Sequence, residues 1–305
     1  MHLHHLPAAL VFAFSALLVS SVNAAEDGKL HIVVFGAHPD DPQFKAGGSA
    51  IKWAKQGHHV KLVAVTNGDI GHWQEAGGPL AQRRKAEVEA TGKVWGIETE
   101  VLDIHDGELL PTLENRKLIT KVIREFNADI VISHRPWDYH PDHRYVGVLV
   151  QDAAFMVTVP FFCPDIPFLK KNPVFMYSSD GFQKPYPFKP DVAVALDDVF
   201  DQKVEGLHLM PSQVYEGGAS GSAEYVKTVP PASDETMRKA WLKRRWQARQ
   251  GNEADKYRDL LIKWYGEEQG KAVKFAETFE LCEYGARPTE AQLRELFPFF
   301  PAAAK

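Results

Sequence analysis

The stretch HIVVFGAHPDDPQFKAGGSA, residues 31–50, combines three local patterns that set the start of the fold. The run HIVVFGA (31–37) is short and apolar, which is typical of a buried strand. GGSAIKWAKQG (47–57) has the composition of a helix that ends at a glycine. The loop between them would ordinarily carry Gly, Asn or Ser. Instead it carries a histidine and two adjacent carboxylates, His38, Asp40 and Asp41.

The alternation of apolar strand and helix continues along the chain. Further strands are expected at 59–66, 98–104, 128–133 and 173–179, and helices at 80–96, 114–127 and 197–210. Repeated strand–helix units predict a mostly parallel sheet covered by helices on both faces, a three-layer α/β fold. Two amphipathic helices, at 234–250 and 254–266, are expected near the C-terminus. The segment 158–190 is rich in Pro and aromatic residues, which predicts long loops.

The composition is that of an ordinary globular protein. The chain has 305 residues, 45% of them hydrophobic and 25% charged, which suits one large domain, expected at 28–300. Its net charge of −5 argues against a general nucleic-acid binder. Two cysteines, Cys163 and Cys282, could form one disulfide or stay free, and the oligomeric state is left open.

The N-terminus has the pattern of a secretory signal peptide, residues 1–24. An apolar run leads to Val22-Asn23-Ala24, whose small residues predict cleavage before Ala25. The opening MHLHH lacks Lys and Arg, so an uncleaved membrane anchor is the alternative, although the run is short for a span of about 20 residues. We therefore expect a periplasmic or secreted protein without stable membrane insertion after cleavage.

Two loops concentrate the ionisable residues: AHPDD (37–41) and SHRPWDYHPDHR (133–144). Each follows an expected apolar strand, so both should lie at the carboxyl edge of the sheet, where open α/β sheets bind ligands. Alone, HPDD could be an acidic turn that caps a helix, because Asp is a favoured N-cap residue. A second His- and Asp-rich loop at the same edge favours a metal site instead.

Imidazole and carboxylate groups bind zinc, which takes three protein ligands in catalytic sites. A single turn can present His38 and Asp41 to one point, and His143 or His140 is then the third candidate ligand. Asp40 is placed to take a proton from water, and His140 to stabilise an oxyanion or protonate a leaving amine.

Three further residues of the second loop have supporting roles in this hypothesis. Asp142 is expected to orient an imidazole. His134 and Asp138 either anchor the loop by hydrogen bonds or contact the substrate. A dinucleotide site is disfavoured, because the first strand is followed by two carboxylates rather than G-x-G-x-x-G.

These motifs resemble those of the LmbE-like deacetylases, which are related to the PIG-L enzyme that N-deacetylates glucosaminyl-phosphatidylinositol. The resemblance rests on AHPDD followed by GG and on HRPWDYHPDH, and it spans most of residues 30–281. Intervening landmarks also agree, namely TNGDIG (66–71), Arg84 with Glu87, DGEL (106–109) and FAETFEL (275–281).

The resemblance implies a zinc-dependent hydrolase with a Rossmann-like fold that removes N-acetyl groups from an N-acetylglucosamine-type sugar or glycoconjugate. The zinc ligands carried over by this resemblance are His38, Asp41 and His143, with Fe²⁺ as the alternative metal. Asp40 would be the general base, His140 the oxyanion stabiliser or acid, and Arg84 a residue near the substrate.

One departure from the family pattern concerns the substrate rim. Many members carry His-x-Ser-Gln where this chain has MPSQ, so Met210 replaces a histidine and the identity of the sugar stays open. Two rival functions remain at this point. A non-haem Fe(II) oxygenase also uses two histidines and a carboxylate, but with an expected double-stranded β-helix. A sugar-binding protein without activity would need no base, whereas Asp40 and His140 are present.

Overall fold

The computed structural model describes residues 28–301 and contains a seven-stranded sheet with the order β3-β2-β1-β4-β5-β7-β6. The first five strands in sequence run parallel to one another. They are β1 (His31–Gly36), β2 (His59–Ala64), β3 (Glu98–Val101), β4 (Ile130–Ser133) and β5 (Val174–Ser178). β7 (Ala276–Gly285) runs antiparallel to β5, and β6 (Val192–Ala195) pairs antiparallel with β7 at the edge. The predicted α/β fold with a mostly parallel sheet is confirmed.

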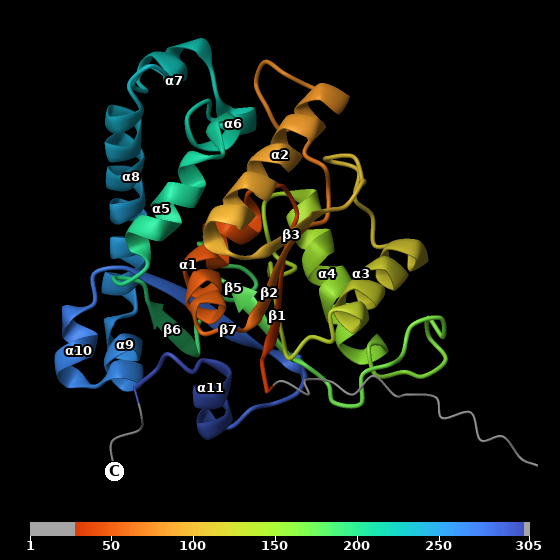
Figure 1. Cartoon of the computed structure of the whole chain (residues 1–305). Coiled ribbons are helices and arrows are strands. Elements are labelled where there is room, and N and C mark those ends of the chain that lie inside the picture. Colours follow the sequence, from red (N-terminus) through yellow and green to blue (C-terminus); the bar gives the residue numbers. More distant parts are fainter. Residues whose placement is uncertain (1–27, 302–305) are drawn as a thin grey trace, which may run out of the picture.

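Helices cover both faces of the sheet (Figure 1). α1 (Asp41–Lys55), α2 (Gly78–Trp95) and α5 (Phe200–His208) form one layer, and α3 (Leu113–Glu125) and α4 (Pro141–Met156) form the other. β1 supplies both cores, because successive side chains of a strand point to opposite faces. Ile32 and Val34 belong to the core under the first layer, while Val33 and Phe35 belong to the core under the second.

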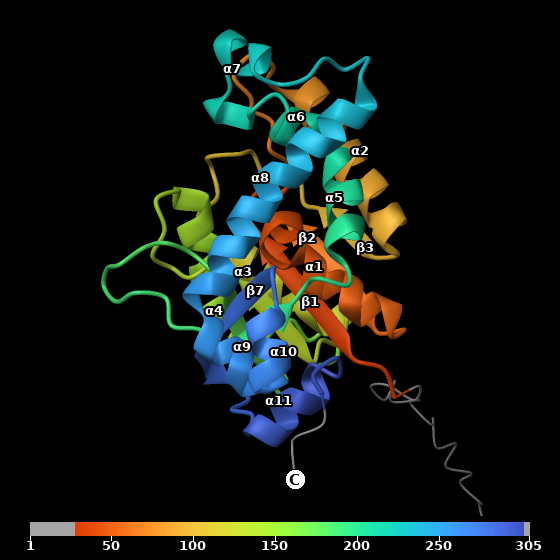
Figure 2. The ribbon, with the colours of Figure 1, turned by 90° about the vertical axis from the view of Figure 1, so that its left-hand side faces the viewer.

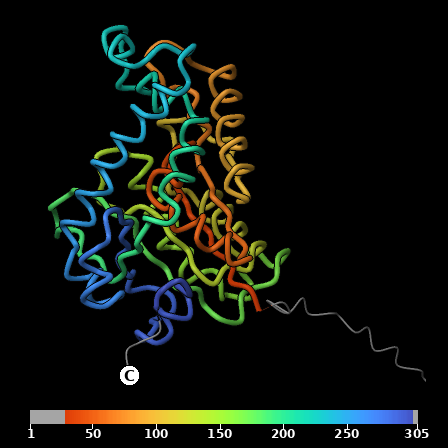
Figure 3. The backbone as a smooth tube through the Cα atoms, turned by 60° about the vertical axis from the view of Figure 1, so that its left-hand side comes forward, coloured from red at the N-terminus to blue at the C-terminus, as the bar shows by residue number. Residues whose placement is uncertain are grey.

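The C-terminal part wraps one side of this sandwich. α6 (Pro211–Val214), a short 3₁₀ turn (Gly218–Ser220) and α7 (Ala223–Lys227) lead into the long helix α8 (Glu235–Lys256). Figure 2 shows α8 crossing the molecule in front of α1, and the tube in Figure 3 follows the same path from α7 down to the C-terminal helices. Those helices are α9 (Arg258–Tyr265), α10 (Glu267–Ala272) and α11 (Glu290–Leu296).

Several boundaries and elements differ from the sequence-based expectations. α1 begins at Asp41 rather than at 47, so the second carboxylate of HPDD lies in its first turn. Three elements were not predicted: α4, β6 and β7. The polar HPDH motif begins α4, β6 has only four residues, and β7 carries a glutamate at every third position, Glu277, Glu280 and Glu283. Both cysteines are buried and unpaired.

The predicted signal peptide, 1–24, lies outside the described residues. Within residues 28–301, the structure contains no helix with the length and apolar character needed to cross a membrane.

Candidate active site

The two polar loops meet at the point where strand order reverses. The sheet runs outward from β1 through β2 and β3 in one direction and from β4 through β5 in the other. The loop after β1 carries His38, and the segment after β4 carries His140 and His143 at the start of α4. The rings of His38 and His143 lie 5.1 Å apart between centroids, although the residues are far apart in the sequence. This is the edge at which open α/β sheets bind ligands.

Three side-chain atoms form a compact triangle within this edge. His38 Nδ1 lies 3.4 Å from Asp41 Oδ2 and 3.2 Å from His143 Nε2, and His143 Nε2 lies 3.3 Å from Asp41 Oδ2. The structure thus brings together the three residues predicted as metal ligands. Two imidazole nitrogens and one carboxylate oxygen are a donor set that suits zinc or ferrous iron.

The outer nitrogens of both imidazoles face carboxylates. His38 Nε2 lies 3.0 Å from Asp106 Oδ1 and 3.4 Å from Asp142 Oδ2, while His143 Nδ1 lies 3.1 Å from Asp138 Oδ1. A carboxylate favours a proton on the nitrogen that faces it, so the other ring nitrogen carries the lone pair. Three lone-pair atoms therefore point at one another inside the triangle, and a cation bound between them would resolve this conflict.

The electrostatics of the same residues support a cation site. Burial lowers the pKa of His143, but the charge of Asp41 and the contact with Asp138 outweigh burial and raise that pKa to about 9. Burial likewise raises the pKa of Asp41, yet the charges of His143 and His134 hold it well below its usual range. The cluster thus attracts positive charge, which protons or a divalent ion can supply.

His134 is close to the triangle but anchors the loop. Its ring stacks on His143 at 4.2 Å, and its Nε2 lies 3.4 Å from Asp41 Oδ2. The same Nε2 accepts a hydrogen bond from the backbone N–H of Ala37 at 3.2 Å, so its lone pair is already used. The geometry therefore favours the anchoring interpretation of His134 over a ligand role.

Asp40 occupies the N-cap position of α1 but does not cap the helix with its side chain. Its carboxylate is 14% exposed and lies 3.6 Å from Nη2 of the buried Arg84. Burial and the neighbouring charge of Asp41 raise the pKa of Asp40, and Arg84 opposes that rise. A carboxylate with a raised pKa that faces a cleft is suited to accept a proton from water near neutral pH.

His140 is the N-cap residue of α4 and has a defined hydrogen-bonding state. Its Nδ1 accepts a hydrogen bond from the backbone N–H of Asp142 at 3.2 Å. The neutral ring consequently carries its proton on Nε2, which makes this nitrogen a hydrogen-bond donor. The rings of His38 and His140 meet edge to face, 4.6 Å apart, beside the triangle.

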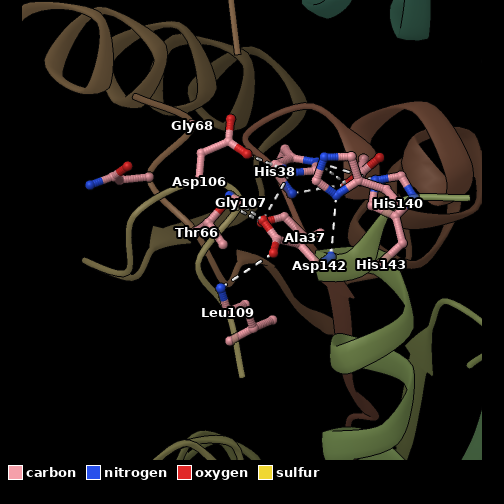
Figure 4. Close-up of polar contacts among 12 residues, drawn as sticks. Ala37, His38, Thr66, Gly68, Asp106, Gly107, Leu109, His140, Asp142 and His143 are labelled. Carbon is pink, nitrogen blue, oxygen red and sulfur yellow. Dashed lines mark hydrogen bonds and ion pairs between the residues drawn. The ribbon is translucent and has the colours of Figure 1, made fainter. Parts of the chain in front are cut away.

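A third strand-end loop, after β3, completes the site. Figure 4 shows Asp142 accepting hydrogen bonds from the backbone N–H groups of Gly107, at 2.7 Å, and Leu109, at 3.3 Å. The same loop places Asp106 against His38. DGEL (106–109) is a landmark of the family resemblance, but the motif alone indicates no role for Asp106.

The site opens into a cleft of ≈ 510 Å³. His38, Asp40, Asp41, Arg84, Asp138, His140 and His143 all line it, as do Lys45 and Arg249, which the sequence analysis did not single out. Gln213 of the MPSQ segment also lines the cleft, whereas Met210 is fully buried in the hydrophobic core. His208 bonds Tyr215 Oη at 2.7 Å, so it does not substitute for the missing histidine.

Comparison with known proteins identifies the family. Residues 33–154 match the family described as PIG-L: GlcNAc-PI de-N-acetylase. The chain is 30% identical to the diacetylchitobiose deacetylase of Thermococcus kodakarensis over 226 residues, which cover 71% of this chain and 84% of the relative. It is also 23% identical to the 4-oxalmesaconate hydratase of Pseudomonas putida, over 59% of this chain and 73% of the relative.

Solved structures show the same fold. The N,N'-diacetylchitobiose deacetylase of Pyrococcus horikoshii superposes with a TM-score of 0.61 at 22% identity and covers 82% of this chain and 83% of its own. The 4-carboxy-2-hydroxymuconate hydratase of Pseudomonas putida superposes with a TM-score of 0.63 at 20% identity, over 86% of this chain and 98% of its own. By its sequence similarity to the Thermococcus relative, the chain belongs to the LmbE-like/PIG-L family of metal-dependent amidohydrolases.

Proposed function

We propose that this protein is a zinc-dependent hydrolase that removes N-acetyl groups from an N-acetylglucosamine-type sugar or glycoconjugate. The observation that carries the proposal is the triangle of lone pairs from His38, Asp41 and His143. The carboxylate of Asp40 lines the same cleft. In this proposal those three residues hold the metal, with Fe²⁺ as the alternative ion. The catalytic unit corresponds to residues 28–300.

Hydrolysis of an acetamide requires activated water and stabilisation of negative charge on the carbonyl oxygen. A zinc ion in such a site supplies Lewis acidity toward both the water and the carbonyl. Asp40 accepts the proton that water loses as its oxygen bonds to the carbonyl carbon. Arg84, at 3.6 Å, keeps the carboxylate of Asp40 directed toward the cleft and available in its charged form.

His140 acts on the other side of the carbonyl. Its Nε2–H donates a hydrogen bond to the developing oxyanion, because the hydrogen bond from Asp142 holds Nδ1 as the acceptor. When the C–N bond breaks, the amine nitrogen takes a proton from the acid form of Asp40, while His140 keeps its Nε2 proton and acts only as a hydrogen-bond donor. Acetate and the free amino sugar are the products. The oxygen of the water ends in acetate and one of its protons on the amine, so the hydrolysis is balanced.

The amino-sugar substrate is supported by the relatives. The Thermococcus protein is named for diacetylchitobiose, and a relative from Bacillus anthracis, 25% identical over 66% of this chain, is named a probable N-acetyl-alpha-D-glucosaminyl L-malate deacetylase. Both names describe an N-acetylated glucosamine carrying another group. An acetylated amino sugar is therefore the first substrate class to test.

The test is acetate release by zinc-loaded protein from N-acetylglucosamine and diacetylchitobiose. Asp40→Asn should reduce kcat by roughly 10²–10⁴-fold, because it removes the base, while the zinc content stays at the wild-type level. Asp165→Asn, at an exposed carboxylate that pairs with Lys121, is the matched control and should behave like the wild type. Full activity in Asp40→Asn would remove the assigned base.

The two rivals raised by the sequence can be separated from the deacetylase. The mostly parallel sheet differs from the double-stranded β-helix expected of the oxygenase. An oxygenase would also need oxygen for turnover, whereas hydrolysis of an acetamide does not. A sugar-binding protein without activity would release no acetate, and Asp40→Asn would leave its function unchanged.

A hydratase is a second candidate, because a relative and a solved structure, both from Pseudomonas putida, are named as hydratases. Such an enzyme adds water across a carbon–carbon double bond of an unsaturated acid, so it consumes the conjugated chromophore and forms no acetate. Loss of ultraviolet absorbance from an unsaturated dicarboxylic acid, together with no acetate release from any acetylated sugar, would favour the hydratase.

Export is a further part of the proposal and rests on the sequence pattern of residues 1–24. Cleavage before Ala25 would produce a mature chain that begins Ala-Glu-Asp. Expression of the full chain in a bacterial host, fractionation, and mass spectrometry of the periplasmic protein test this directly. Recovery of the uncleaved chain in the membrane fraction would support the anchor alternative.

A further inference from the structure

The cleft is lined by charges of both signs. Beside the carboxylates of the metal-site cluster it holds two cations, Lys45 from α1 and Arg249 from α8. Lys45 Nζ donates a hydrogen bond to the backbone carbonyl of Ser179 at 2.6 Å. The guanidinium of Arg249 lies over the ring of Trp246, with 4.9 Å between Cζ and the ring centroid. Among residues 28–301, neither cation forms an ion pair with a carboxylate.

The lack of an ion pair with a carboxylate distinguishes Lys45 and Arg249 from the cations around them. Lys203 of α5, which also donates a hydrogen bond to the backbone carbonyl of Phe44 in α1, bonds Glu277 at 2.7 Å. Arg84 lies beside Asp40, and Arg135 pairs with Asp180 at 2.6 Å. Burial, and then the charge of Arg249, lower the pKa of Lys45, although the charges of Asp41, Asp138 and Asp180 oppose this shift. An anion bound between the two cations would oppose it further.

Beside Arg249, the cleft continues into a second hollow. A groove of ≈ 420 Å³ shares Phe44, Gln213 and Arg249 with the cleft, and its wall includes Trp246 and Arg245 of α8. A substrate longer than one sugar can therefore extend from the metal site past Arg249. The aromatic wall would contact the apolar faces of such a ligand, while the arginines would face its charges.

We propose that Lys45 and Arg249 form an anion-binding subsite, which selects acetylated amino sugars that carry a carboxylate or phosphate group on the part that extends away from the acetamide. The inference rests on the proposed deacetylase function and specifies its substrate class. The metal site and Asp40 act on the acetamide, and the subsite binds the remote anion. The anion raises the affinity for the whole substrate and fixes its direction in the cleft.

Acetate release tests the inference with neutral and anionic sugars. The neutral substrates are N-acetylglucosamine and diacetylchitobiose. The phosphate arm is N-acetylglucosamine 1-phosphate and 6-phosphate. The carboxylate arm is 2-acetamido-2-deoxyglucuronic acid, whose C6 carboxylate lies away from the acetamide. The wild type should show a higher kcat/KM for at least one anionic arm, and the preferred arm identifies the anion. Lys45→Gln and Arg249→Gln should each lower that value roughly tenfold, mainly through KM, and leave the neutral substrates within about threefold.

Arg244→Gln is the matched control, because Arg244 is exposed on the same helix and does not line the cleft. It should retain the preference of the wild type. Equal losses for neutral and anionic sugars in Lys45→Gln and Arg249→Gln, or no anionic preference in the wild type, would overturn the subsite.

A binding measurement separates failure of the subsite from failure of the deacetylase function. Calorimetric titration with glucosamine, glucosamine 1-phosphate and glucosamine 6-phosphate needs no acetyl group and no turnover. Tighter binding of a phosphorylated sugar, lost in the Lys45→Gln/Arg249→Gln double variant, supports the subsite even if no acetylated sugar is hydrolysed. Equal binding of all three ligands contradicts the subsite even if acetate is released.

Discussion

Two buried charge clusters lie along α1, and they differ in whether the chain neutralises them. In the middle of the helix, Glu277 of β7 accepts hydrogen bonds from the backbone N–H groups of Gly48 and Ser49, both at 2.8 Å. Lys203 bonds Glu277 at 2.7 Å and the carbonyl of Phe44 at 3.0 Å. One positive and one negative charge are therefore fully partnered inside the protein. We call this the closed cluster.

The second cluster, at the N-terminus of α1, is not balanced. The imidazoles of His38 and His143 contact four carboxylates, those of Asp41, Asp106, Asp138 and Asp142. Their inner lone pairs and Asp41 Oδ2 converge within 3.4 Å. We call this the open cluster. A buried charge that the chain neutralises holds the surrounding elements in place. An excess of buried negative charge, in contrast, creates a site for a positively charged ligand.

Removing a ligand from the open cluster should have the largest effect on function. His143→Ala deletes one corner of the triangle, so the zinc content should fall close to zero. Acetate release should fall by at least roughly 10³-fold, because the metal contributes several kcal/mol of transition-state stabilisation. Metal analysis and the acetate assay measure both. His105→Ala, at an exposed histidine outside the triangle, should change neither, and a metal-loaded, active His143→Ala protein would contradict the assignment.

Breaking the closed cluster should instead reduce stability. Glu277→Gln removes the negative charge and leaves Lys203 buried without an ionic partner, which should lower the free energy of unfolding by about 3–5 kcal/mol. Urea unfolding measures this loss. Adding Lys203→Met to the same variant should recover much of the stability, because no buried charge then remains. A single variant as stable as the wild type would show that the pair does not hold α1 in place.

The parallel half of the fold and the convergence of His38, Asp41 and His143, the proposed metal ligands, could be predicted from the sequence, because both depend on local patterns. Each apolar run is followed by a helix, and His38, Asp41 and His143 lie in short motifs at strand ends. The closed cluster could not be predicted in this way. Glu277 lies in β7 and Lys203 in α5. Nothing in either local sequence indicates that the two side chains meet against the backbone of α1.

The same limit applies to the two cations that line the cleft, Lys45 and Arg249. Arg249 belongs to a basic run, KRRWQAR, which the sequence presents as an ordinary solvated helix face. The role that we propose for Arg249 depends on α8 crossing the molecule, because this brings Arg249 into the lining of the same cleft as Lys45. Asp106 is similar, because its contact with His38 depends on the loops after β3 and β1 meeting at the same edge of the sheet.

A smaller loss of activity is expected for His140, which we propose stabilises the oxyanion and does not bind the metal. His140→Gln removes the Nε2–H donor and should lower kcat by roughly 10²–10³-fold, as for other oxyanion donors. The metal content should stay at the wild-type level, because His140 lies outside the triangle formed by His38, Asp41 and His143. Loss of the metal in this variant would make His140 a ligand, as the sequence-based alternative allowed.

The finest test concerns the carboxylates that surround the two ligand imidazoles. Asp138 Oδ1 lies 3.1 Å from His143 Nδ1 and also accepts a hydrogen bond from the backbone N–H of His140 at 3.1 Å. Asp138→Asn keeps an oxygen acceptor at this position but removes the negative charge, so His143 becomes a weaker donor to the metal. The affinity for zinc should fall by roughly 10–100-fold, measured by competition with a chelator, while saturating zinc restores most of the activity. Unchanged affinity would mean that Asp138 only positions the loop, and the excess negative charge of the open cluster would then reside in Asp41, Asp106 and Asp142 alone.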